Sequence, residues 1–286
     1  MRFDFIQHHQ QRWPVAIMCD LLAVSRSGFY ARLDRPTSAR RRRQEELIEK
    51  IEAVHQQSRR TYGSPRVTVE LKEQGVAVCE NTVARLMKQA DIAARARRSF
   101  VPRTTDSAHP HRIADNQLEQ NFAAAAPNCK WACDITYIPT AQGWLYLAVV
   151  MDLFSRKVVG WSMREHLRAE LVEEALAMAL RSRRPGAGLV HHSDRGVQYA
   201  CDDYQRLLAE HGITCSMSRR GNCYDNAVVE SFFGSLKREL MPEDGWASAS
   251  AARLAVFEWI EVFYNRQRRH SSLGYQSPER FEARVN

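Results

Sequence analysis

The order of strand-like and helix-like segments between residues 127 and 240 constrains the fold more than any other feature of this sequence. Three strand-like segments with short hairpin connections come first, and helices and strands alternate after them. The expected strands are 129–140, 143–155, 157–164, 188–194 and 213–218, and the expected helices are 169–183, 202–212 and 225–240. Hairpins join antiparallel neighbours and helical crossovers join parallel ones, so we expect an α/β domain with a mixed five-stranded sheet.

Two of the expected strands carry an aspartate where a charge is costly. Asp134 lies in the middle of the apolar stretch WACDITYI, and Asp194 ends the strand GLVHHSD. Glu230 lies on helix 225–240, at the margin of its apolar stripe. A buried carboxylate needs a partner or a metal, and crowded carboxylates raise one another's pKa. A lone acid is usually a salt-bridged structural residue, but three acids from two strands and a helix predict a shared site.

The three carboxylates predict a divalent metal site. Donor sets made only of oxygen suit Mg²⁺ or Mn²⁺. Two such ions can activate a nucleophile and stabilise the leaving oxygen of a phosphodiester. No G-x-x-x-x-G-K-[ST] loop occurs in the sequence, so we do not expect nucleotide hydrolysis.

Several segments resemble the catalytic core of DDE transposases and retroviral integrases: WACDITYIPT, VMDLFSRKVVGW, HHSDRGVQY and GNCYDNAVVESFFGSLKREL. The 35 residues between Asp194 and Glu230 match the signature spacing of that family. The closing YNRQRRHSSLGYQSPERF (264–281) resembles, more narrowly, the second-reading-frame subunit of insertion-sequence transposases of the third family. The resemblance covers about residues 60–281. It implies a ribonuclease-H-like fold with Asp134, Asp194 and Glu230 as the catalytic, metal-binding triad.

The resemblance also implies an activity and its partners. A DNA transposase of this kind is a Mg²⁺-dependent endonuclease and polynucleotidyl transferase, using two ions. It cuts the ends of its insertion element, and the released 3′-hydroxyl attacks another phosphodiester in-line, giving a circular intermediate before insertion. Its partners would be duplex DNA, as inverted-repeat ends and target, and further copies of the chain on paired ends. No long leucine heptad precedes the core, so an upstream-frame protein is an expected partner or fusion.

The uneven charge of the chain indicates a part that binds a polyanion. Residues 1–112 contain 21 Lys and Arg against 12 Asp and Glu, whereas the remaining residues contain 20 against 21. The whole excess of +8 therefore lies in the first two-fifths of the chain. Such a distribution is typical of a nucleic-acid-binding region joined to a second part, although a basic face can also serve only solubility.

Two segments of this basic part have the spacing of a helix-turn-helix. In residues 14–33, helical apolar spacing is broken by AVS, and Ser25 is placed to cap the next helix. In residues 62–92, Gly75 is expected to end one helix and Asn81 to cap the next. The side chains expected to face inward are Val67, Leu71, Val83, Leu86 and Met87. The region is therefore expected to be all-α.

Seven basic or polar side chains are expected to contact DNA. They are Thr82, Arg85 and Lys88 on the second helix, Arg97 and Arg98 in a basic arm, and Arg268 and Arg269 near the C-terminus. The first three would face outward, as a recognition helix requires. The last two belong to the segment NRQRRHSS, which could instead be a solvated basic helix end.

Lys237 is an eighth expected DNA contact. It follows Glu230 by two helical turns and shares its helix face, but it is too far along for the usual direct ion pair. We expect its ammonium to meet a phosphate near the terminal bases of the element.

Other residues near these motifs leave alternatives open. Asp152 is expected to cap a strand turn rather than bind metal. His192 either shapes the site or packs, and Asn226 either orients Glu230 or serves the start of its helix. The rings of Tyr199 and Tyr224 either stack on unpaired bases or are buried.

The expected domain boundaries follow from these changes in sequence texture. They are 1–37 for a first helix-turn-helix-like segment, 38–103 for a second, 104–126 for a linker with one short helix, 127–240 for the catalytic core, and 241–286 for a helical basic tail. No apolar run approaches the roughly 20 residues needed to span a bilayer. The seven cysteines are scattered, which favours free thiols in a reducing cytoplasm. The resemblance implies a bacterial cytoplasmic protein that associates with the nucleoid.

Three other functions remain open at this stage. A structure-specific nuclease of the same superfamily would share the metal site. A tyrosine recombinase would use the Arg, His and Tyr of RRHSSLGY, but would leave the three acids unexplained. A DNA-binding regulator with an inactive core would need no intact carboxylates.

Overall fold

The computed structural model describes residues 1–34, 38–95, 110–220 and 222–284. Within these residues the chain forms two compact units, Met1–Ala53 and Val54–Asn286. None of the described helices is both long and apolar enough to cross a membrane.

The first unit is helical. It contains α1 (Arg2–His9), α2 (Val15–Leu21), α3 (Arg26–Leu33) and the first part of α4 (Ala39–Gln57). Ile6, Met18, Cys19 and Phe29 form its small apolar core. The Ser25 hydroxyl accepts a hydrogen bond from the backbone N–H of Gly28 at 2.9 Å, which confirms the predicted cap of α3.

The second unit begins with the end of α4 and continues with the helices α5 (Ser64–Glu73) and α6 (Glu80–Gln89). The residues expected to face inward are buried: Val67, Leu71, Val83, Leu86 and Met87. Gly75 adopts φ +79° just after α5, as a helix-ending glycine does. The prediction for Asn81 is wrong, because α6 already begins at Glu80, so Asn81 lies inside the helix and extended Cys79 takes the cap position.

The sheet of the second unit has the order β3-β2-β1-β4-β5. Its strands are β1 (Lys130–Thr140), β2 (Gly143–Asp152), β3 (Val158–Arg164), β4 (Val190–Ser193) and β5 (Thr214–Met217). The first three pair antiparallel, whereas β4 pairs parallel with both β1 and β5. This confirms the mixed five-stranded sheet and the ribonuclease-H-like fold.

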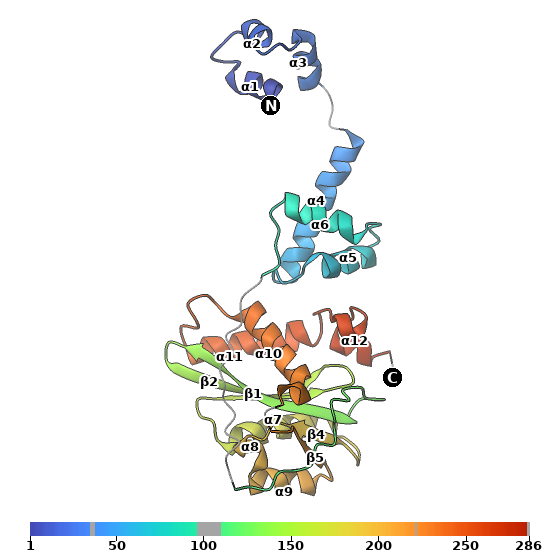
Figure 1. The fold of residues 1–286 in the computed structure, drawn as a ribbon, viewed down its shortest axis with the longest axis vertical. Helices are drawn as coiled ribbons and strands as arrows, with labels where there is room; N and C mark the ends of the chain where they lie inside the picture. The colour runs from blue at the N-terminus through green and yellow to red at the C-terminus, as the bar shows by residue number, and fades with distance from the viewer. Residues whose placement is uncertain (35–37, 96–109, 221, 285–286) are drawn as a thin grey trace. The chain divides into compact units, whose positions relative to one another are not determined.

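Helices cover both faces of this sheet. Figure 1 shows α10 (Ala227–Leu240) and α11 (Ala249–Phe257) above the strands, and α7 (Ala169–Arg183), α8 (Val197–Ala200) and α9 (Asp202–Glu210) below them. α7 packs closely on β3 because Gly160 has no side chain. A Cβ there would lie 2.2 Å from the carbonyl oxygen of Ala175. Trp131, Leu176, Tyr204 and Leu208 belong to the core beneath the sheet.

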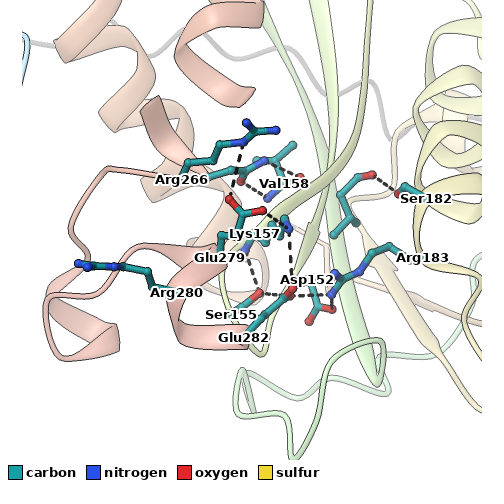
Figure 2. A network of polar contacts seen from close by, with 12 residues as sticks. Asp152, Ser155, Lys157, Val158, Ser182, Arg183, Arg266, Glu279, Arg280 and Glu282 are labelled. Carbon is teal, nitrogen blue, oxygen red and sulfur yellow. Dashed lines mark hydrogen bonds and ion pairs between the residues drawn. The ribbon is translucent and has the colours of Figure 1, made fainter. Parts of the chain in front are cut away.

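The C-terminal segment returns to the catalytic core. After α11 come the π-helical η2 (Glu258–Tyr264), the short η3 (Ser271–Leu273) and α12 (Pro278–Glu282). Glu282 in α12 accepts hydrogen bonds from Ser155, after β2, and from Arg183, at the end of α7 (Figure 2). The last helix is therefore tied to two elements of the core.

The segment before β1 differs from the expected linker. Over the described residues 110–126 the chain forms bends and turns, and the expected short helix is not present there. Leu118 is buried, and the backbone N–H of Gln117 donates to the hydroxyl of Ser216 in β5 at 2.8 Å. This stretch therefore packs on the core, because apolar Leu118 and several amide side chains find partners there.

Candidate active site

Asp134 and Asp194 meet in one small pocket. Asp134 lies in the middle of β1, and Asp194 directly follows β4, which pairs parallel with β1. Both side chains are half-buried and line a pocket of about 30 Å³. The remaining lining residues are Ile135, Tyr137, Tyr146, Leu167, Gly196, Gln198 and Tyr199. Neighbouring parallel strands thus bring together two of the three predicted acids.

The backbone holds each aspartate by a local hydrogen bond. Oδ1 of Asp134 accepts from the N–H of Ile135 at 2.8 Å, and Oδ1 of Asp194 accepts from the N–H of Gly196 at 2.9 Å. A Cβ on Gly196 would lie 3.0 Å from that same Asp194 oxygen. The glycine of the DRG sequence therefore leaves room for the carboxylate.

The electrostatics of the pocket are dominated by burial and by the neighbouring acids. Burial raises the pKa of Asp134 well above its usual value, and the carboxylates of Asp194 and Glu230 raise it further. Lys237 acts in the opposite direction but does not offset the other effects. Carboxylates crowded in this way are stabilised as anions by a bound cation, which suits a metal site.

Glu230 approaches the pocket from α10. This helix packs against β1, and Glu230 lies in its first turn with an exposed side chain. Partial burial raises the pKa of Glu230. In the described part of the chain, no group of three His, Cys, Asp or Glu side chains is gathered closely enough to hold a metal ion. Glu230 is thus near enough to affect Asp134 electrostatically but is not among the residues that line the pocket.

Lys237 lies further along α10 and also faces β1. Its ammonium is 5.1 Å from the centre of the Tyr137 ring, a cation–π contact. Burial lowers the pKa of Lys237, and the negative charge of Asp134 raises it. The ammonium is therefore part of the surroundings of the acidic pocket.

The start of α10 contains the residue that sequence reasoning missed. Asp225 is fully buried in η1 (Cys223–Asn226) and accepts hydrogen bonds from Arg219, Asn116 and Gln120. The one available signal was an aspartate beside Asn226, a few residues after two arginines. Its amide partners come from a segment about a hundred residues earlier, which local patterns do not reveal.

The predicted DNA contacts fall into different environments. Arg85 and Lys88 are exposed on α6, while Thr82 is half-buried, with its hydroxyl 3.2 Å from the sulfur of Cys79. Arg97 and Arg98 lie outside the described residues. The structure therefore supports outward-facing positions for Arg85 and Lys88.

Arg268 and Arg269 are buried in ion pairs, against the expectation of an open basic surface. The side chain of Arg268 is 5% exposed and pairs with Glu239 at 2.6 Å. That of Arg269 is also 5% exposed and pairs with Glu70 and Glu73 of α5. A guanidinium so enclosed by carboxylates has no open side for a phosphate, so we correct the assignment of both residues to a structural role.

Four further expectations can be compared with the structure. Asp152 accepts from the N–H of Phe154 at 2.9 Å, so its predicted role as a turn cap is confirmed. His192 is buried between the hydroxyls of Ser216 and Ser218. Tyr199 is buried, which excludes base stacking in this structure, whereas Tyr224 is 71% exposed.

Three models of known protein families match this chain. A family model described as an integrase core domain matches residues 124–223, and a second model of the same description matches residues 211–278. A model described as an HTH-like domain matches residues 42–100.

Two curated relatives match nearly the full chain. The transposase InsF for insertion sequence IS3A of Escherichia coli (strain K12) is 45% identical over 284 residues, 99% of this chain and 98% of the relative. An insertion element IS600 uncharacterized 31 kDa protein of Shigella sonnei is 45% identical over 269 residues, 94% of this chain and 98% of the relative. Among solved structures, the HTLV-2 integrase catalytic core in complex with magnesium is 17% identical, with a TM-score of 0.41, covering 55% of this chain and 98% of that one. The chain belongs to the IS3 family of insertion-sequence transposases, with an integrase core domain and an HTH-like domain.

Proposed function

We propose that this transposase cleaves the ends of its insertion element and joins the resulting 3′-hydroxyls to DNA with Asp134, Asp194 and Glu230 as catalytic residues. The observation that carries the proposal is the shared pocket of Asp134 and Asp194, where the pKa of Asp134 is raised by burial and by both other acids. Two half-buried carboxylates brought together by neighbouring parallel strands suit a cation and a phosphodiester better than a structural role.

The three residues fit Mg²⁺ or Mn²⁺ by their donor chemistry. Carboxylate oxygens are the ligands that these ions prefer, and the raised pKa of Asp134 reflects a charge that such ions would neutralise. When bound, two ions would supply activation of the attacking hydroxyl and charge stabilisation at the leaving oxygen. Asp134 and Asp194 would hold them from the sheet, and Glu230 would close the site from α10.

DNA would be held by other parts of the chain. Arg85 and Lys88 on the exposed side of α6 would contact the inverted-repeat ends. Lys237 would contact the strand next to the acidic pocket. Two copies of the chain would act on paired ends, with an upstream-frame protein as a further partner, in a nucleoid-associated assembly.

Isosteric variants of the three acids test this proposal. Asp134→Asn, Asp194→Asn and Glu230→Gln should each reduce cleavage and joining of element-end duplexes by about a thousandfold, because several kcal/mol of transition-state stabilisation are lost. Binding of the ends should persist. Asp203→Asn is the matched control, since this acid is 72% exposed on α9 and pairs with Arg206.

The outcomes distinguish the alternatives. Near-normal joining in any of the three variants would remove that residue from the mechanism. Cleavage without any joining by the wild-type protein would favour a structure-specific nuclease. End binding without cleavage under all conditions would favour a regulator with an inactive core.

A further inference from the structure

Two adjacent residues at the start of α10 tie this helix to different parts of the core. Asp225 and Asn226 are 0% and 5% exposed, although both side chains are polar. Glu230 follows Asn226 by one helical turn. What these two residues bind therefore determines where the backbone that carries Glu230 lies.

Asp225 is held by donors from two segments. It accepts from the backbone N–H, Nε and Nη2 of Arg219 at 2.8, 3.1 and 2.9 Å. It also accepts from the side-chain amides of Asn116 at 3.1 Å, Gln120 at 3.0 Å and Asn222 at 3.2 Å. These bonds, those from Arg219 first, hold the pKa of Asp225 well below its usual range. A buried carboxylate satisfied so fully is a fixed anchor.

Asn226 makes a less usual connection. It occupies the N-cap position of α10, where an Asn side chain normally accepts from the helix backbone, yet it makes no such bond. Its Nδ2 instead donates to the carbonyl oxygen of Cys133 at 3.0 Å, and its buried Oδ1 has no partner among the described residues. Asn226 therefore does not cap α10, and its buried Oδ1 acceptor is left without a hydrogen bond within the described part of the chain. Leaving such an acceptor unsatisfied costs about 1–3 kcal/mol. What the bond provides is a direct link to the residue before Asp134.

We propose that Asp225 and Asn226 are positioning residues that set the distance of Glu230 from Asp134, and so determine the affinity of the site for divalent metal. Asn226 joins the first turn of α10 to the peptide that leads into Asp134. Asp225 fixes the preceding turn, η1, to the segment around Asn116 and Gln120. Because the Glu230 side chain is exposed, the position of its carboxylate depends on where the backbone of α10 is anchored. The inference rests on the metal-binding triad of the proposed function.

A pair of buried asparagines allows a matched test. Asn226→Ala removes the bond to β1 near Asp134. Asn265→Ala is the control, because Asn265 is also buried and makes two 3.0 Å hydrogen bonds to the backbone of Val158 in β3, away from the acidic pocket. Binding of Mn²⁺ to the full chain is measured from the EPR signal of the free ion, and melting temperatures are measured beside it. Both variants should lose stability, but only Asn226→Ala should weaken Mn²⁺ binding, by about ten- to a hundredfold.

A second variant keeps the test informative if Asn226→Ala does not fold. Arg219→Gln removes a side chain that is 57% exposed but weakens the anchor of the fully buried Asp225. It should raise both the Mn²⁺ dissociation constant and the Mg²⁺ concentration needed for half-maximal cleavage. Asp225→Asn should do the same, and the double variant should add little, since both changes break one pair.

The results separate this inference from the proposed function. If Asp134→Asn abolishes Mn²⁺ binding while Asn226→Ala and Arg219→Gln bind it as tightly as the wild type, the positioning role is wrong and the triad stands. If Mn²⁺ binding is unaffected by Asp134→Asn and Glu230→Gln, the metal site itself is wrong. If Asn265→Ala loses as much Mn²⁺ affinity as Asn226→Ala, the weaker binding comes from general destabilisation and the inference is wrong.

Discussion

Arg183 at the end of α7 donates hydrogen bonds to both carboxylate oxygens of Glu282 in the last helix, at 2.8 and 2.6 Å. Its Nη2 also lies 3.1 Å from Asp152, the last residue of β2 (Figure 2). Asp152 is fully buried, and the side chains of Glu282 and Arg183 are 10% and 15% exposed. The C-terminal helix is therefore part of the folded core, linked to the sheet by an ion-pair network.

Glu282→Gln should destabilise the protein. The change leaves the buried Arg183 with one charged partner fewer, and breaking a buried pair costs about 3 kcal/mol or more. Glu279→Gln is the control, because Glu279 is 49% exposed and its contacts to Lys157 and Arg266 are both 3.7 Å, so it should cost less than about 1 kcal/mol. Urea unfolding measures both. Equal losses in the two variants would contradict a special role for the Arg183 network.

Acid should destabilise the core through His191. This histidine is fully buried, with Nε2 2.8 Å from the sulfur of Cys133 and 2.9 Å from the hydroxyl of Tyr204. Burial lowers its pKa to about 3. The unfolded chain binds a proton below about pH 6.5, whereas the folded protein does not. The stability from neutral His191 is therefore complete above that pH and is lost as the pH falls toward about 3.

In His191→Gln, the free energy of unfolding should accordingly fall less steeply as the pH is lowered. The wild-type slope contributed by one such group approaches about 1.4 kcal/mol per pH unit within this window. Chemical unfolding at several pH values measures the slope, and His211→Gln, on an exposed histidine after α9, is the control. If the free energy of unfolding of His191→Gln depends on acidic pH as the wild type does, other groups cause the loss of stability in acid.

The exposed basic side chains of α6 should contribute to DNA affinity through phosphates. Arg85→Ala and Lys88→Ala should each weaken binding of element-end duplexes and reduce the slope of log affinity against log salt by about 0.9. Arg206→Ala, an exposed arginine on α9 of the core, should change neither quantity. Fluorescence anisotropy across a salt series measures both. An unchanged salt slope in the two α6 variants would exclude these side chains as phosphate contacts.

Local sequence patterns predicted the strands and helices, which depend on the spacing of apolar residues along the chain. The apolar runs around Asp134 and before Asp194 predicted strands, and the parallel pairing of β1 and β4 brings these acids together. The partners of Arg269 were beyond such reasoning. Its guanidinium pairs with Glu73, 196 residues earlier, and nothing in NRQRRHSS distinguishes a buried ion pair from an exposed phosphate contact.

The anchor at Asp225 was unpredictable for a related reason. A single aspartate in YDNA carries no local signal of the six donor groups that surround it. Those donors come partly from residues 116–120, whose polar composition resembles that of a linker. The fold supplied their position, because buried Leu118 holds this segment against the core.

Lys237 should affect catalysis through DNA rather than through folding. Its ammonium lies against the Tyr137 ring and is attracted by Asp134, so it is held beside the acidic pocket without an ion pair to Glu230 among the described residues. A cation there is placed to neutralise a phosphate of the strand that enters the pocket. Lys237→Ala should lower kcat/KM for cleavage of element ends about tenfold, the loss of one charge-assisted contact.

The neighbouring Arg238 provides the matched control for Lys237. Both residues are basic and lie in the last turns of α10, but Arg238 is exposed and contacts Ser235 of its own helix. Arg238→Ala should leave cleavage near the wild-type rate, while Lys237→Ala should lose activity mainly through a higher KM at an unchanged melting temperature. Because the lost contact is electrostatic, the difference between the two variants should shrink as salt rises. A large fall in melting temperature for Lys237→Ala, with normal kcat/KM per folded molecule, would instead assign Lys237 to packing against Tyr137.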